Sequence, residues 1–173
     1  MNSKNLLKIK NKLKKYLNEK EVLDIIIFGS AIKGKALPKD IDIAVIGGKK
    51  INIPNFHVSL LNPKDFFVKP PSIIHTLLRE GYSIRNKCFL SESFKFKNKV
   101  LFKYELKDLT PSLKVKVVNV LRGKNKEKGR VIEYGGEWLV NQVFIVPIGT
   151  EHLFNEFFLN FKVKFKKYYI LMH

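Results

Sequence analysis

The stretch "FGSAIKGKALPKDIDIAVIGG", Phe28 to Gly48, decides the fold of the first part of this 173-residue chain. It joins two short apolar runs, residues 22–28 and 40–46, and both are rich in the β-branched residues that favour buried strands. Asp40 and Asp42 stand one residue apart in the second run. Because alternate side chains of a strand point to the same face, the two carboxylates are predicted to project together.

Two carboxylates on one face repel each other unless a cation lies between them. Mg²⁺ binds one or two carboxylates together with waters and substrate phosphates, so Asp40 and Asp42 are candidate metal ligands. Gly29 and Ser30 follow the first run at a predicted turn, and Gly34 comes close behind. Backbone N–H groups and a hydroxyl in such a turn bind phosphate oxygens. The competing interpretation is a surface aspartate pair at a strand end beside an ordinary turn.

This Gly-Ser turn, followed after nine residues by Asp-Ile-Asp-Ile, resembles the nucleotidyltransferase superfamily typified by DNA polymerase beta, and most closely its minimal members. The resemblance covers about residues 3–86. It implies that Asp40 and Asp42 hold Mg²⁺ and that an NTP donates its nucleoside monophosphate to an acceptor hydroxyl, with release of pyrophosphate. Lys33 lies where many members carry arginine. The residues that the resemblance assigns to the nucleotide are Gly29, Ser30, Lys33 and Gly34.

One part of the superfamily pattern is missing. Active members usually carry a third carboxylate on the following strand, and the matching run here, residues 55–61, contains no acid. His57 and Ser59 alternate on one face of that run, and His57 is predicted to join the two aspartates as the third catalytic residue. The alternative is a half-buried structural histidine. Asp65 and Glu105 are weaker substitutes for the missing acid.

The remaining pattern predicts an α/β (α+β) protein with two domains, residues 1–88 and 97–173. The first would hold a nucleotidyltransferase-like mixed sheet with one helix over residues 3–19 and another that starts at 71 and is stopped at Gly81. The second reads β-α-β-β-α-β, the order of a ferredoxin-like split unit. Its strands are predicted at 99–106, 129–134, 137–147 and 162–172, and its helices at 110–123 and 149–161. A second turn at Asn141 and Gln142 would divide the long strand in two.

The charge predicts a polyanionic partner. Lysine and arginine number 33 against 15 acidic residues, a net charge of +18 that is spread along the chain. Such a surplus attracts RNA or another polyanion, although a general lysine bias would produce the same count. In the last predicted strand Lys162, Lys164 and Lys166 alternate with apolar residues, which predicts a basic face for RNA. Lysines that protect an edge strand from aggregation are the alternative. No DNA sequence specificity is evident.

The single cysteine, Cys88, excludes an internal disulfide and a multi-cysteine zinc site. No apolar run approaches the ~18 residues of a membrane span, so no membrane association and a cytoplasmic location are expected. The sequence therefore predicts an Mg²⁺-dependent nucleotidyltransferase that modifies a hydroxyl of RNA or protein. A catalytically degenerate nucleotidyltransferase fold that binds RNA or a ribonucleoprotein is the alternative. A nucleotidyltransferase from a toxin and antitoxin pair, which would need a partner protein, is a third.

Overall fold

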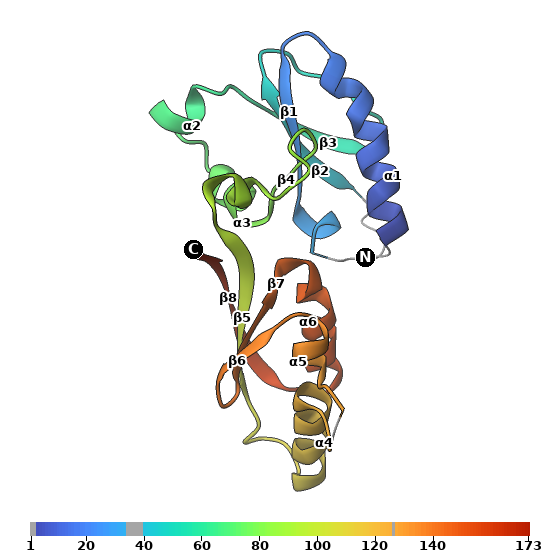
Figure 1. The fold of residues 1–173 in the computed structure, drawn as a ribbon, viewed down its shortest axis with the longest axis vertical. Coiled ribbons are helices and arrows are strands. Elements are labelled where there is room, and N and C mark those ends of the chain that lie inside the picture. The colour runs from blue at the N-terminus through green and yellow to red at the C-terminus, as the bar shows by residue number, and fades with distance from the viewer. Residues whose placement is uncertain (1–2, 34–39, 126) are drawn as a thin grey trace. The chain divides into compact units, whose positions relative to one another are not determined.

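The computed structural model describes residues 3–33, 40–125 and 127–173, and Figure 1 shows its fold. The chain forms two compact units, Met1–Lys97 with His173 and Asn98–Met172, which are called the first and the second unit below. Within the described residues each unit contains one four-stranded sheet with helices. The predicted mixed α/β fold class is therefore confirmed.

The first unit is a mixed sheet with strand order β3-β2-β1-β4. Strand β1 runs antiparallel to both β2 and β4, while β2 runs parallel to β3. Its helices are α1 (Ser3–Lys14), α2 (Asp65–Val68) and α3 (Ile74–Glu80), with 3₁₀ turns at Lys15–Asn18, Gly29–Ala31 and Leu90–Phe94. Its strands are β1 (Val22–Phe28), β2 (Ile41–Gly47), β3 (Phe56–Leu61) and β4 (Tyr82–Ser83).

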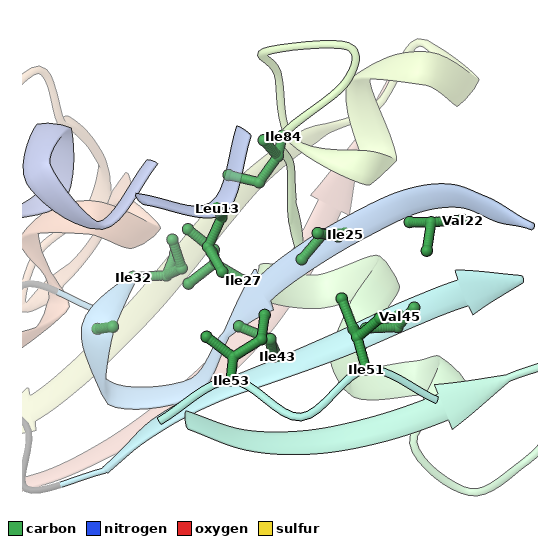
Figure 2. Packing of buried hydrophobic residues seen from close by; sticks show 11 residues of the cluster. Leu13, Val22, Ile25, Ile27, Ile32, Ile43, Val45, Ile51, Ile53 and Ile84 are labelled. Atoms are coloured by element: carbon green, nitrogen blue, oxygen red, sulfur yellow. The ribbon is translucent and has the colours of Figure 1, made fainter. Parts of the chain in front are cut away.

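Strands β1 and β2 are buried on both faces, which explains why their sequences read as continuous apolar runs. Alternate residues of β1, Ile25 and Ile27, pack with Leu13 of α1 on one face (Figure 2). The intervening Ile26 packs with Leu77 of α3 on the other face. The sheet is thus fixed between two helices, and the turn after β1 is held at its end.

The second unit has strand order β6-β7-β5-β8, with β7 antiparallel to both of its neighbours. Since β7 lies between β5 and β6, the unit is a split β-α-β arrangement, as the ferredoxin-like prediction requires. Its strands are β5 (Lys97–Glu105), β6 (Glu137–Val140), β7 (Val143–Pro147) and β8 (Lys164–Met172). Its helices are α4 (Pro111–Arg122), α5 (Arg130–Glu133) and α6 (Glu151–Asn160), with a 3₁₀ turn at Ile148–Thr150.

The β-α-β-β-α-β order is present, but one strand was assigned to the wrong residues. The predicted strand at 129–134 is the short helix α5, which buries Val131. The predicted strand at 137–147 is instead a hairpin of β6 and β7, because Asn141 and Gln142 form a turn in which Gln142 adopts a φ of 61°. The turn at Asn141 and Gln142, which the sequence offered as an alternative, is therefore present, and the unit still has four strands.

Helices cover one face of the second sheet, and the opposite face carries exposed lysine side chains. Phe102 of β5 packs against Phe144, Phe154 and Phe158, so α6 lies over this face. Residues of β5 that alternate with the buried ones include the exposed Lys103 on the opposite face. Within the described residues no helix combines the length and the apolar character that crossing a membrane requires.

Candidate functional site

The turn after β1 depends on Gly29. This residue has a φ of +75°, which L side chains rarely adopt, and its carbonyl accepts hydrogen bonds from the N–H groups of Ile32 (3.1 Å) and Lys33 (3.3 Å). A Cβ atom at Gly29 would lie only 2.8 Å from Oδ2 of Asp42. Glycine therefore permits both the turn and the close approach of its backbone to this carboxylate.

Asp42 stands at the centre of the three strands that build this end of the sheet. In the ladder it pairs with Phe28 of β1 on one side and with His57 of β3 on the other. The Nδ1 atom of His57 lies 3.3 Å from Oδ1 of Asp42. The side chains of Asp42 and His57 are 35% and 74% exposed, so a solvent-borne ligand has access to both. The carboxylate thus lies between the Gly29 turn and the imidazole.

The other residues predicted for the site lie around this centre. Asp40 is exposed and lies in a bend directly before β2, so the strand alternation applies to Asp42 but does not by itself orient Asp40. Ser30 is half-buried in the 3₁₀ turn that follows β1. Gly34 lies outside the described residues. The shared orientation of the two carboxylates stays a prediction.

The donor set at this end of the sheet suits Mg²⁺. Exposed carboxylate oxygens combined with waters and substrate phosphates are its usual ligands, and Asp42 presents a partly exposed carboxylate beside the Gly29 turn. Among the described residues no three or more His, Cys, Asp or Glu side chains gather closely enough to enclose a metal ion. An ion bound here would therefore need ligands from outside the protein, such as phosphates and waters.

Lys33 has a partner that sequence analysis did not foresee. Its Nζ atom lies 2.9 Å from Oε2 of Glu80, the last residue of α3. The Nε atom of Arg79 lies 3.3 Å from the same oxygen. Glu80 is buried although it ends a short helix, where a glutamate is usually exposed. No spacing pattern in the sequence connects it to the Gly-Ser turn.

The two weaker substitutes for a third carboxylate lie elsewhere. Asp65 is an exposed residue at the start of α2. Glu105 belongs to the second unit, where the Lys107 ammonium lies 3.0 Å away and lowers the pKa of the Glu105 carboxyl by hydrogen bonding. His57 is thus the residue of the predicted set that contacts Asp42.

A basic groove of about 200 Å³ lies on the second unit, lined by Lys103, Glu105, Lys164, Phe165 and Lys166. Lys164 Nζ lies 2.7 Å from Oδ2 of Asp108, and this hydrogen bond lowers the pKa of the Asp108 carboxyl and raises the pKa of Lys164. Lys162 precedes β8 and adopts a φ of 53°, so it does not share the alternation of the strand. The sequence analysis did not include Lys103 in this basic surface, because Lys103 joins Lys164 and Lys166 only through the pairing of β5 with β8.

Residues 11–66 match the family model described as Polymerase beta, Nucleotidyltransferase. The matched range contains the Gly29 turn, both aspartates and His57. Comparisons with curated proteins and with solved structures give no significant match. The resemblance predicted for the N-terminal part of the chain is therefore confirmed. It indicates a nucleotidyltransferase-type activity, and domains of this type generally use an NTP and a divalent metal.

Proposed function

We propose that the first unit transfers a nucleoside monophosphate from an Mg²⁺-bound NTP to a hydroxyl of RNA or protein. The observation that carries the proposal is the position of Asp42. Its Oδ1 lies 3.3 Å from Nδ1 of His57, and its Oδ2 lies so close to the Gly29 backbone that a Cβ atom on Gly29 would be 2.8 Å from it. A phosphate-binding turn, a metal-binding carboxylate and a proton acceptor are the parts that in-line displacement at the α-phosphate requires.

Each residue has a distinct role in this reaction. Asp40 and Asp42 would hold Mg²⁺, which neutralises charge on the phosphates and stabilises the leaving pyrophosphate. The N–H groups of the turn and the Ser30 hydroxyl donate hydrogen bonds to phosphate oxygens. Nδ1 of His57 lies 3.3 Å from Oδ1 of Asp42, and in the neutral tautomer that carries its hydrogen on Nδ1 this contact is a hydrogen bond donated to Asp42. In that tautomer Nε2 would be the nitrogen that accepts the proton of the attacking hydroxyl. The imidazole thus takes the place of the missing carboxylate.

One observation favours a second candidate function. Strand β3 carries no acid, and the described residues contain no cluster of three or more metal-ligating side chains. A domain that binds nucleotide or RNA without catalysis has the same features. Incubation of the full chain with each labelled NTP, Mg²⁺ and total RNA, followed by gel electrophoresis, separates the two functions. Label on RNA or on the protein supports transfer, and its absence with all four nucleotides contradicts it.

We expect His57→Ala to lower the rate of transfer by roughly 100-fold, because a positioned general base contributes about 10²–10⁴-fold. Affinity for the Mg²⁺-bound nucleotide should change little, since the proposed role of His57 concerns the acceptor. Single-turnover rates and nucleotide dissociation constants measured together check this expectation. His75→Ala, at an exposed position on α3, is the matched control. Equal rates for the two variants would assign His57 a structural role.

The exposed lysines of the second sheet support RNA as the acceptor. Lys103, Lys164 and Lys166 line one groove on β5 and β8, and the net charge of +18 attracts phosphate backbones. Asp108 pairs with Lys164 and offsets part of its positive charge, so a substitution at Asp108 tests whether this surface binds RNA. A protein acceptor would not need such a row of cations.

Replacing Lys103, Lys164 and Lys166 by Gln should weaken RNA binding and reduce its salt dependence. Each phosphate contact on a single strand contributes about −0.7 to the slope of log affinity against log salt, so the slope should fall in magnitude by up to about two units. Asp108→Asn should strengthen RNA binding and increase its salt dependence, because it releases the Lys164 ammonium and removes a negative charge. Titration of labelled RNA at several salt concentrations measures both effects.

The same number of charges can be removed from the first unit as a control, with Gln at Lys8, Lys12 and Lys15. If this variant alone changed the slope, the RNA surface would lie on the first unit. If no salt-sensitive binding occurred with the unmodified chain, a general lysine bias would explain the charge and a protein acceptor would be favoured.

A further inference from the structure

Glu80 carries a buried charge next to the candidate site. Its side chain is 2% exposed, and its Oε2 atom contacts Nζ of Lys33 at 2.9 Å and Nε of Arg79 at 3.3 Å. A buried carboxylate is costly unless cations and hydrogen-bond donors surround it. A well-packed apolar residue would serve the core at least as well, so the charge points to a role beyond packing.

The position of Glu80 relates it to the phosphate-binding turn. In the ladder between β1 and β4, Ile26 pairs with Ser83 and Ile27 with Tyr82. Glu80, the last residue of α3, comes two residues before Tyr82, so the end of α3 lies near the end of β1 that leads into the turn. Lys33 links the turn to Glu80, because its backbone N–H donates to the Gly29 carbonyl at 3.3 Å while its side-chain ammonium contacts the Glu80 carboxylate. The turn is therefore tied to the end of α3 through Lys33.

We propose that Glu80 is a positioning residue that holds the turn from Gly29 to Lys33 in its phosphate-accepting conformation by fixing the Lys33 side chain. The inference rests on the proposed function for the meaning of that conformation. Lys33 then acts mainly as a strut between the turn and α3, and phosphate recognition falls to the turn N–H groups and Ser30. Arg79 shares the Glu80 oxygen and keeps the buried carboxylate paired on the helix side.

Hydrogen exchange tests the conformational part of the proposal without any nucleotide. Glu80→Gln keeps the shape of the side chain and removes its charge, so the amides of Ile32 and Lys33 should exchange at least tenfold faster in NMR measurements. Glu151→Gln is the matched control, because Glu151 is equally buried and contacts Lys167 at 2.5 Å in the second unit. Unchanged exchange in Glu80→Gln, or equal acceleration of these amides in Glu151→Gln, would overturn the proposal.

Lys33→Gln offers a second route if Glu80→Gln folds poorly, since Lys33 is the more exposed partner at 24%. It should accelerate exchange of the Ile32 amide to a similar degree. In the double variant the two effects should not add, because each removes the same contact. Additive acceleration would show that the two residues act separately and would contradict the proposal.

Nucleotide affinity tests the functional part. Titration of Mg²⁺-bound ATP, GTP, CTP and UTP into the full chain identifies the nucleotide that binds, and Glu80→Gln should raise its dissociation constant about tenfold. Lys33→Gln should give a similar increase, and the double variant no more than either alone. An unchanged dissociation constant in Glu80→Gln overturns the positioning role while the proposed function stands. If none of the four binds to the unmodified chain, the proposed function fails and hydrogen exchange alone decides whether Glu80 fixes the turn.

Discussion

Asp42→Asn should lower the rate of nucleotidyl transfer by about 1,000-fold or more while the fold persists. The substitution keeps the size of the side chain but removes the negative charge that would hold the metal next to the Gly29 turn. A metal that neutralises phosphate charge contributes several kcal/mol to the transition state, and each ~1.4 kcal/mol is a factor of ten in rate. Asp42 is partly exposed and pairs with no lysine or arginine among the described residues, so its charge contributes little to stability.

Single-turnover transfer and the thermal unfolding midpoint should be measured on the same preparation. Asp65→Asn is the matched control, because Asp65 is an exposed carboxylate of the same unit outside the site. Replacing Asp40 and Asp42 together by Ala should in addition abolish Mg²⁺-dependent nucleotide binding. Transfer at the normal rate in Asp42→Asn would remove this carboxylate from the mechanism, whatever the result for the control.

Gly29→Ala should reduce transfer by more than tenfold through two separable effects. A non-glycine residue at a φ of +75° costs roughly 1–2 kcal/mol of folding free energy. The new methyl group would also lie 2.8 Å from Oδ2 of Asp42, and because that atom ends a side chain, the carboxylate should rotate away before the backbone moves. The metal ligand would then be displaced from the phosphate-binding turn.

Gly135→Ala separates the two effects. Gly135 has a similar φ of +72°, but a Cβ atom there would meet only the Pro147 side chain at 3.7 Å, an ordinary contact. The two variants should therefore lose similar free energies of unfolding in urea titrations, while only Gly29→Ala loses transfer. Equal transfer by both variants would show that the closeness of Gly29 to Asp42 has no bearing on the reaction.

The central strands and the turn between them could be predicted because local chemistry alone determines them. β-branched runs that are buried on both faces of a sheet contain no polar interruption, so β1 and β2 were recognised within a residue of their observed ends. Gly29 and Asp42 could be assigned to one site because the Gly-Ser turn and the Asp-Ile-Asp-Ile run together match the superfamily pattern, and the structure shows their strands as antiparallel neighbours. Register then brings their backbones together without any long-range information.

Features that depend on tertiary contacts could not be predicted. The run predicted as a strand at 129–134 has β propensity, yet it contains the short helix α5, which buries Val131 in the second unit. Lys162 was counted with the last strand because alternation alone does not reveal that its φ is 53°. In the sequence Glu80 looks like any glutamate at the end of an amphipathic helix, and only the fold shows that it is buried and paired with Lys33.

The order of strands in the second sheet also has a consequence for synthesis on the ribosome. Strand β5 leaves the ribosome first, and its partners β7 and β8 are synthesised about 40 and 60 residues later. During this interval the apolar residues of β5 remain exposed, without a partner strand. Lys97, Lys99 and Lys103 alternate with Val100, Phe102 and Tyr104 along this strand. Charges at such spacing act as gatekeepers that oppose association between nascent chains. The lysines of β5 should therefore protect yield during expression, independently of any ligand that the folded surface binds.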